Sequence, residues 1–377
     1  MKNRLLLILL LSPIFCLAQN SPPENIKILM DSAAKRMTKK PLIHSASIAI
    51  VYQGKEFIGH YGELEKGKNN CPDNETIYEI GSLSKTFAGT LAAKAVCEKK
   101  LNIDDEIQKY LPENYPNLKY GDQPILVKHL LSHTSGFPNM LPFEANTILA
   151  DFTNHDTPAK INELYKNYHQ KDFLRDLHKV KIDTVPGYKY SYSSAGSQLV
   201  AFILEKVYQT KYEKLLTDYV TQNIAMQNTK INLSGQETKK LAVGYHSDNS
   251  VITSPMPQLP WGASGNMKST IPDMVKYIKF QLKNNKIVAE SHKTIVKFDN
   301  DFSIGYLWNI DTGNKKLGTF YVHHGGVPRS QCYIYIVPKY DLGAFIITNQ
   351  SGTETAKIME DALTEIFDKI TVMEKNG

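Results

Sequence analysis

Ser82 and Lys85 are the two residues of this sequence whose types and spacing are best suited to covalent catalysis. Positions three apart share one face of a helix, so the Lys85 amine can reach the Ser82 hydroxyl and take its proton. Ser82 would also stand at the helix N-terminus, where backbone N–H groups stabilise an oxyanion forming on an attacked carbonyl. Without further partners, the pattern is explained better by a helix cap beside a solvated lysine.

Tyr192 is the first candidate partner for this pair. It lies in residues 186–196, a turn and short loop that lead into an apolar helix. A phenol held near an ammonium group has its ionised form stabilised. Tyr192 beside Lys85 would then be able to accept the Ser82 proton.

Residues 323–326 supply the second candidate, a His-His-Gly-Gly run on a predicted edge strand. Gly325 and Gly326 would permit a ligand to approach the backbone closely. Side chains alternate along a strand, so His323 and His324 point to opposite faces. His324 is therefore expected to be buried, or to act through a neighbouring residue, rather than to be catalytic.

The elements that position these residues divide into an antiparallel sheet and a group of helices. Five β-rich runs are expected at residues 45–52, 56–61, 319–324, 331–337 and 343–348, the first two forming a hairpin. A helix with one apolar stripe follows, to about residue 372. Between residues 86 and 277, helices alternate with polar loops rich in proline.

This order predicts an α/β (α+β) fold: an antiparallel sheet flanked by helices, built from N- and C-terminal segments, with a largely helical lobe inserted between them. The sheet lobe would comprise about 24–85 and 278–377, and the helical lobe about 86–277. Together they would form a single domain, 19–377. The cleft between the lobes is the expected place for a site.

The first 18 residues have the features of a secretory signal peptide. Lys2 and Arg4 precede an apolar run that ends at Leu17, and Ala18 offers a cleavage site. Cys16 is a poor lipoprotein anchor, because Phe15 stands where a small residue is wanted. We expect a periplasmic or secreted protein with no membrane span after cleavage.

Composition excludes several function classes. Loss of the signal segment lowers the formal net charge from +6 to +4, and no basic block suits a nucleic-acid groove. Cys71, Cys97 and Cys332 indicate neither a disulfide framework nor a metal knuckle. His129 and His133 form half of a zinc-protease motif that has no glutamate beside His129, so both are interpreted as structural. No metal or other cofactor is expected.

At this point the chain resembles the serine β-lactamase and penicillin-binding-protein superfamily, in the branch of class C β-lactamases, DD-carboxypeptidases and related esterases. The resemblance extends from about Ile26 to Ile370. Four blocks carry it: residues 77–87, 101–112, 130–136 and 262–273. It implies the fold derived above.

The resemblance implies a role for each catalytic candidate. Ser82 would be the acylated nucleophile, Lys85 the partner that activates it, and Tyr192 the second proton carrier. The oxyanion hole would consist of the backbone N–H groups of Ser82 and Gly326, and each such donor typically lowers a barrier by ~3 kcal/mol.

Two of the substrate-binding candidates, Ser194 and Arg329, depart from the family's pattern. His323 takes the place of the lysine in the Lys-Thr-Gly strand motif, a substitution that this branch commonly shows, and is followed by Gly325 and Gly326. Ser194 stands where the family usually has asparagine, and serine is too short to reproduce the two-ended amide contact with an acylamino side chain. Arg329 replaces a glycine; it would bind a substrate carboxylate or, as the simpler interpretation, lie solvated in a loop.

These residues predict an exported serine hydrolase that acts through an acyl-enzyme on amide or ester bonds, with β-lactam or D-alanyl peptide type substrates. One alternative is a carboxylesterase of the same fold without β-lactam activity, which Ser194 favours. Another is a non-catalytic binding or sensor module, against which the intact Ser82, Lys85 and Tyr192 argue. The expected partner is a small-molecule or peptide substrate, and the sequence specifies no oligomeric state.

Overall fold

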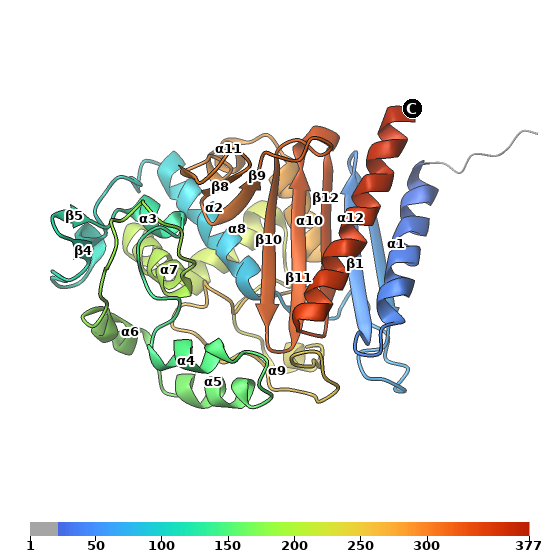
Figure 1. Cartoon of the computed structure of the whole chain (residues 1–377), viewed down its shortest axis with the longest axis horizontal. Coiled ribbons are helices and arrows are strands. Elements are labelled where there is room, and N and C mark those ends of the chain that lie inside the picture. Colours follow the sequence, from blue (N-terminus) through green and yellow to red (C-terminus); the bar gives the residue numbers. More distant parts are fainter. Residues whose placement is uncertain (1–21, 377) are drawn as a thin grey trace, which may run out of the picture.

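An eight-stranded antiparallel sheet organises the fold, with strands from both ends of the chain (Figure 1). The computed structural model describes residues 22–376. The strands lie in the order β2-β1-β12-β11-β10-β9-β8-β7. Their bounds are β1 Ser45–Tyr52, β2 Lys55–Gly62, β7 Val296–Lys297, β8 Phe302–Gly305, β9 Trp308–Asp311, β10 Phe320–Val327, β11 Ser330–Val337 and β12 Leu342–Thr348.

Strand β1 joins the two ends of the chain within this sheet. Its hairpin with β2 turns at Gln53 and Gly54, whose φ angles of 49° and 74° suit a tight two-residue turn. On its other side β1 pairs with β12 along seven residues, with Ala49 opposite Phe345. Every residue of β1 is buried, because helices cover both faces of the sheet.

Helices α1 (Pro22–Thr38) and α12 (Thr353–Asn376) pack together over one face. They share one apolar cluster with the sheet, which includes Ile26, Met30, Leu363, Ile366 and Ile370. The other face is covered by α10 (Ile271–Leu282), which contacts β1 and β12. The sheet is therefore the middle of three layers at this end of the molecule.

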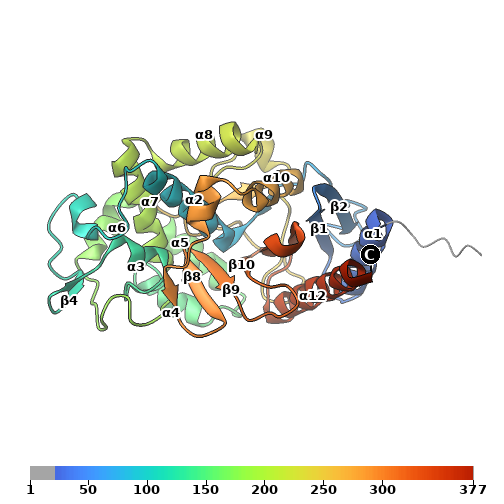
Figure 2. The same cartoon turned by 90° about the horizontal axis from the view of Figure 1, so that it is seen from above.

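Most of the remaining helices lie toward the other end of the molecule, away from α1 and α12 (Figure 2). Helix α2 (Ser84–Cys97) packs against α7 (Ser194–Tyr208) and α8 (Tyr212–Ile224). The shorter helices are α3 Val127–Leu131, α4 Glu144–Ala150, α5 Thr157–Tyr165, α6 Gln170–Leu177, α9 Gly235–Thr238 and α11 Lys286–Ser291. Two short antiparallel pairs join β3 (Tyr78–Glu79) to β6 (Lys268–Ser269) and β4 (Lys119–Tyr120) to β5 (Gln123–Pro124).

The fold class predicted from the sequence is confirmed, as are the N-terminal hairpin, the three C-terminal strands and the last helix. Strand β10 runs three residues further than predicted, because Gly325 and Gly326 stay in register with Cys332 and Gln331. Helix α1 and strands β7 to β9 were not predicted.

The predicted single domain and lobe boundaries stay predictions, and α10 crosses the expected boundary at residue 278. The proposed signal peptide lies outside the described residues. Within residues 22–376, no helix combines the length and apolar character that a bilayer span requires.

Candidate active site

Ser82 lies in a tight 3-10 turn, η1 (Gly81–Leu83), that leads directly into α2. Two contacts of Ser84 fix this turn: its hydroxyl donates to the Gly81 carbonyl at 2.7 Å and accepts from the Met267 N–H at 3.1 Å. Gly81 has a φ of +53°, a conformation that favours glycine. The turn therefore holds Ser82 half-buried, one residue before Leu83, which is the N-cap of α2.

Lys85 is fully buried and contacts Ser82 from the first turn of α2. Its Nζ lies 3.2 Å from Ser82 Oγ and 2.6 Å from the Ser264 carbonyl oxygen. Among the described residues it forms no ion pair, so no opposite charge offsets the loss of hydration of its ammonium form. Burial consequently lowers the pKa of Lys85 to about 7. A large fraction of the lysine is then a neutral amine near pH 7, which is the form that accepts a proton.

Tyr192 contacts the same hydroxyl, donating a hydrogen bond of 2.8 Å to Ser82 Oγ. Lys85 Nζ lies 4.8 Å from the centre of its ring. The sequence argument that Lys85 would stabilise a tyrosinate is wrong for the resting state, because burial raises the pKa of Tyr192 above its usual value. Tyr192 is a neutral phenol here, and Lys85 is the group whose pKa suits a base.

The Tyr192 segment is held by the loop that follows α3. The Ser191 N–H donates to the His133 carbonyl at 2.8 Å, and the Ser193 N–H donates to His133 Nδ1 at 3.2 Å. Ser193 also caps α7, because its Oγ accepts from the Gly196 N–H at 2.8 Å. These contacts set the position of the phenol.

His133, which the sequence analysis interpreted as structural, lies beside Tyr192. Its buried ring lies 4.6 Å from that of Tyr192, and its pKa is held well below 6.5 by burial and then by the charge of Lys85. It is therefore a neutral ring that supports Tyr192, in agreement with the structural role expected from the sequence.

His323 lies on β10, close enough to Lys85 for their charges to interact. Its Nδ1 is 2.7 Å from the His324 carbonyl oxygen, which assigns the proton to Nδ1 and leaves Nε2 as an acceptor. Burial, and then the charge of Lys85, lower the pKa of His323 to about 3. His323 is therefore uncharged and does not replace the positive charge of the family's strand lysine.

Gly325 and Gly326 let β10 pack backbone to backbone against the nucleophile segment. A Cβ at Gly325 would stand 2.2 Å from the Ile80 carbonyl oxygen, and a Cβ at Gly81 would stand 2.8 Å from the Gly326 nitrogen. Larger residues would thus force the strand away. Gly326 also lines the same cavity as Ser82.

Ser194 begins α7 and lines this cavity together with Asn139. The Asn139 side-chain oxygen accepts from the Ser194 N–H at 3.3 Å, and its carbonyl accepts from the Ala195 N–H at 2.8 Å. An amide side chain thus lies on a neighbouring loop, at a residue that sequence reasoning did not select, but its oxygen is already bonded to the Ser194 N–H.

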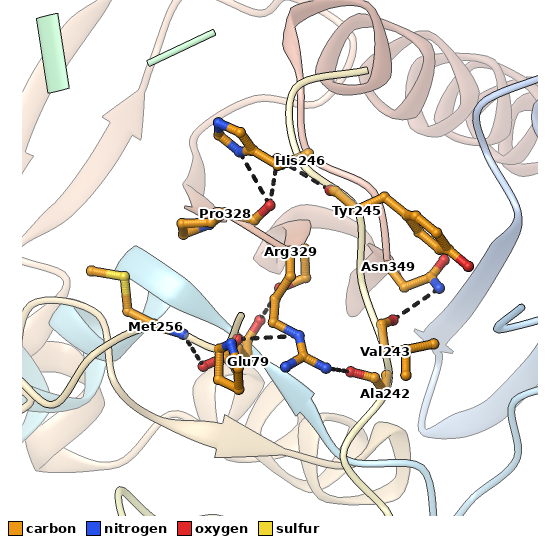
Figure 3. Close-up of polar contacts among 12 residues, drawn as sticks. Glu79, Ala242, Val243, Tyr245, His246, Met256, Pro328, Arg329 and Asn349 are labelled. Carbon is orange, nitrogen blue, oxygen red and sulfur yellow. Dashed lines mark hydrogen bonds and ion pairs between the residues drawn. The ribbon is translucent and has the colours of Figure 1, made fainter. Parts of the chain in front are cut away.

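Arg329 is not brought to the cavity. It is 7% exposed and pairs with Glu79 at 3.7 Å, while its guanidinium also donates to the Ala242 carbonyl (Figure 3). Glu79 in turn accepts from the Met256 N–H at 3.0 Å. The expectation of a solvated loop arginine is wrong, because a buried carboxylate from a distant strand pairs with it. The same pairing leaves the guanidinium away from a substrate carboxylate.

Comparisons with known proteins identify the family of this chain. The β-lactamase family model matches residues 30–366. Protein flp of Staphylococcus aureus (strain MW2) is 27% identical over 90% of this chain, and a β-lactamase of Providencia stuartii is 29% identical over 71% of it. The chain spans 66% and 62% of the lengths of these two relatives.

Two solved structures share the fold. A β-lactamase/D-alanine carboxypeptidase from Yersinia pestis, complexed with citrate, has a TM-score of 0.78 at 20% identity, covering 92% of this chain and 98% of its own. A class C β-lactamase has a TM-score of 0.76 at 19% identity, covering 93% and 99%. The protein belongs to the β-lactamase family.

Proposed function

We propose that this protein is an exported serine hydrolase that forms an acyl-enzyme on Ser82 and cleaves amide or ester bonds in substrates of the β-lactam or D-alanyl peptide type. The observation that carries the proposal is the convergence of Lys85 Nζ and Tyr192 OH on Ser82 Oγ, at 3.2 and 2.8 Å. The signal-like first 18 residues support export.

In the proposed reaction Ser82 Oγ forms a bond to the substrate carbonyl carbon as neutral Lys85 takes its proton. The backbone N–H groups of Ser82 and Gly326 stabilise the oxyanion, each contributing about 3 kcal/mol. The bond to the amine or alcohol then breaks, and Lys85 and Tyr192 return the proton to that leaving group. Water next attacks the acyl carbon, releasing a carboxylic acid and restoring the serine hydroxyl.

A carboxylesterase without β-lactam activity is the second candidate, favoured by His323 and Ser194. A neutral His323 removes the cation that the family's strand lysine would offer to a substrate carboxylate. Ser194 removes the asparagine contact to an acylamino group. A simple ester needs neither contact.

Two experiments test these proposals on the purified protein. Mass spectrometry after treatment with a reactive acyl donor should show one adduct, and Ser82→Ala should abolish it. An unchanged adduct on that variant would remove Ser82 from the mechanism, and no adduct on the wild type would favour a binding or sensor module. Turnover of nitrocefin, a D-Ala-D-Ala peptide and a short-chain p-nitrophenyl ester then separates the two enzymatic candidates.

A further inference from the structure

The cavity beside Ser82 has a volume of about 270 Å³ and lies between the helices and the end of β10. Its polar lining is concentrated near the nucleophile. Eight of its residues have apolar side chains and make up the rest of its wall: Met140, Leu149, Phe152, Ile161, Met256, Leu259, Val327 and Pro328. Such a wall gains free energy by burying hydrocarbon and offers little to a polar substituent.

The cavity lining carries no formal charge. None of its residues is Asp, Glu, Lys, Arg or His. Lys85, the nearest lysine to Ser82, is buried behind the nucleophile and contacts the Ser82 hydroxyl. Arg329 lies in the turn between β10 and β11 and is already paired with Glu79. A substrate carboxylate inside this cavity would thus lose its hydration without gaining a cationic partner.

Polar contacts outside the cavity hold its apolar wall in place. The Glu79 carboxylate, paired with Arg329, accepts from the Met256 N–H and so fixes one lining residue (Figure 3). The His246 ring also lies 2.7 Å from the Phe152 carbonyl oxygen, and the Ser351 hydroxyl donates to the Pro328 carbonyl at 3.0 Å. Because three of its lining residues are held in place, the pocket has a defined size. It should therefore discriminate between acyl chains by their length.

We propose that this cavity is an acyl-binding pocket, and that the preferred substrates are carboxylic esters with an unbranched, uncharged apolar acyl chain of medium length. The proposal rests on the proposed acyl-enzyme at Ser82, in its second form as a carboxylesterase, and specifies the acyl group. An apolar cavity of ~150 Å³ holds one benzene ring. A volume of about 270 Å³ therefore has room for an acyl group of roughly eight heavy atoms.

The test is a series of p-nitrophenyl esters from acetate to dodecanoate, measured on the purified protein below the aggregation limit of each ester. The value of kcat/KM should rise ~4-fold for each added methylene, as expected for burial of a CH2 group. It should reach a maximum near hexanoate or octanoate and then fall. A value that is highest for acetate, or nitrocefin turnover exceeding that of every ester, would overturn the pocket assignment.

A variant inside the cavity and a matched control on the same helix sharpen the test. Leu149→Trp fills part of the pocket from α4 at a half-buried position, and should move the optimum to shorter chains. Thr147→Trp adds the same side chain at an exposed position outside the cavity, and should leave the profile unchanged. An identical profile for Leu149→Trp and the wild type would also overturn the assignment.

The outcome is distinguishable from failure of the proposed function. If acyl adducts form on Ser82 but chain length has no effect, the pocket assignment fails while the acyl-enzyme stands. If no ester, peptide or β-lactam labels Ser82, the proposed function itself fails.

Discussion

Lys85 Nζ lies closer to the carbonyl oxygen of Ser264, at 2.6 Å, than to Ser82 Oγ, at 3.2 Å. The shorter contact fixes one N–H of the amine toward Ser264. When the amine is neutral, this leaves its lone pair free to face Ser82. The Ser264 carbonyl thus orients the proposed base, and burial shields the amine from water.

The pH dependence of kcat/KM should follow the ionisation of Lys85. Burial sets its pKa at about 7, and only the neutral amine can take the Ser82 proton, so the rate should rise with pH through a midpoint near 7 and then level. His323, with a pKa of about 3, is already neutral over this range. Initial rates with one ester between pH 5 and 9 check this, and a rate that falls as pH rises through 7 would contradict it.

Lys85→Met should abolish turnover yet stabilise the fold. In the wild type the pKa falls from 10.5 in the unfolded chain to about 7 in the folded one, so below pH 10.5 the unfolded state binds protons more strongly. Wild-type stability should then decrease as the pH falls from 10.5 to 7. After allowance for the lost contact to Ser264, the methionine variant should gain about 2 kcal/mol at pH 7.

Denaturant unfolding at pH 7 and pH 10 measures this effect. The difference between Lys85→Met and the wild type should shrink at the higher pH. An equal or larger gain at pH 10 would show that desolvation of the amine is not its cause.

Tyr192→Phe should remove the phenol that donates to Ser82 at 2.8 Å while keeping the ring beside His133. Proton transfer of this kind contributes ~100-fold or more. The loss should be greater for an alkyl ester, whose alkoxide needs a proton, than for a p-nitrophenyl ester. Tyr190→Phe is the matched control, and equal losses for the two esters would argue against a role in protonating the leaving group.

Gly81→Ala should impair catalysis through a single added methyl group. The new Cβ would lie 2.8 Å from the Gly326 nitrogen, so β10 must move away from Ser82 and the oxyanion hole proposed above would widen. Loss of one such donor lowers kcat about 100-fold or more. Gly54→Ala is the matched control. Gly54 also has a positive φ, +74°, but no atom lies within 4 Å of the Cβ that the alanine would add.

The Gly54 control should lose only about 1 kcal/mol of stability and retain full activity. Both variants should be compared by thermal unfolding and steady-state kinetics. Similar activity in the two would mean that the approach of β10 to η1 is not needed for catalysis.

Arg329→Met should destabilise the protein without raising the KM of a substrate that carries a carboxylate. It leaves Glu79 buried without its cationic partner, and such losses typically cost about 3 to 5 kcal/mol. Adding Glu79→Gln should recover most of the lost stability, because the unpaired charge is removed. A selective rise in KM for the D-Ala-D-Ala peptide, with stability unchanged, would instead support carboxylate binding by Arg329.

The sheet was predictable where its signals are local. Strands β1, β2, β11 and β12 are β-rich runs of seven or eight residues between clear turns. Strands β7 to β9 have only two to four residues each, too few to show a period. Helix α1 has a usable signal, since Ile26, Met30, Ala33 and Met37 recur at helical spacing and are all buried.

The catalytic candidates were found because a short motif and three ordered blocks surround them. What could not be predicted depends on partners far away in the chain. Arg329 is buried because Glu79 lies opposite it, and no local pattern links the two. The ionisation of Tyr192 and His323 likewise depends on enclosure by several elements, which spacing along a sequence does not reveal.

The pairing of β1 with β12 sets the order of events during synthesis. Ser82 and Lys85 emerge early, but Gly326 and the strand that flanks β1 emerge near the end. A nascent polypeptide therefore cannot assemble the complete reaction centre until almost all of it has been translated. Truncation before β12 should therefore leave a fragment that contains Ser82 and Lys85 but lacks hydrolytic competence, because β1 has lost its partner strand.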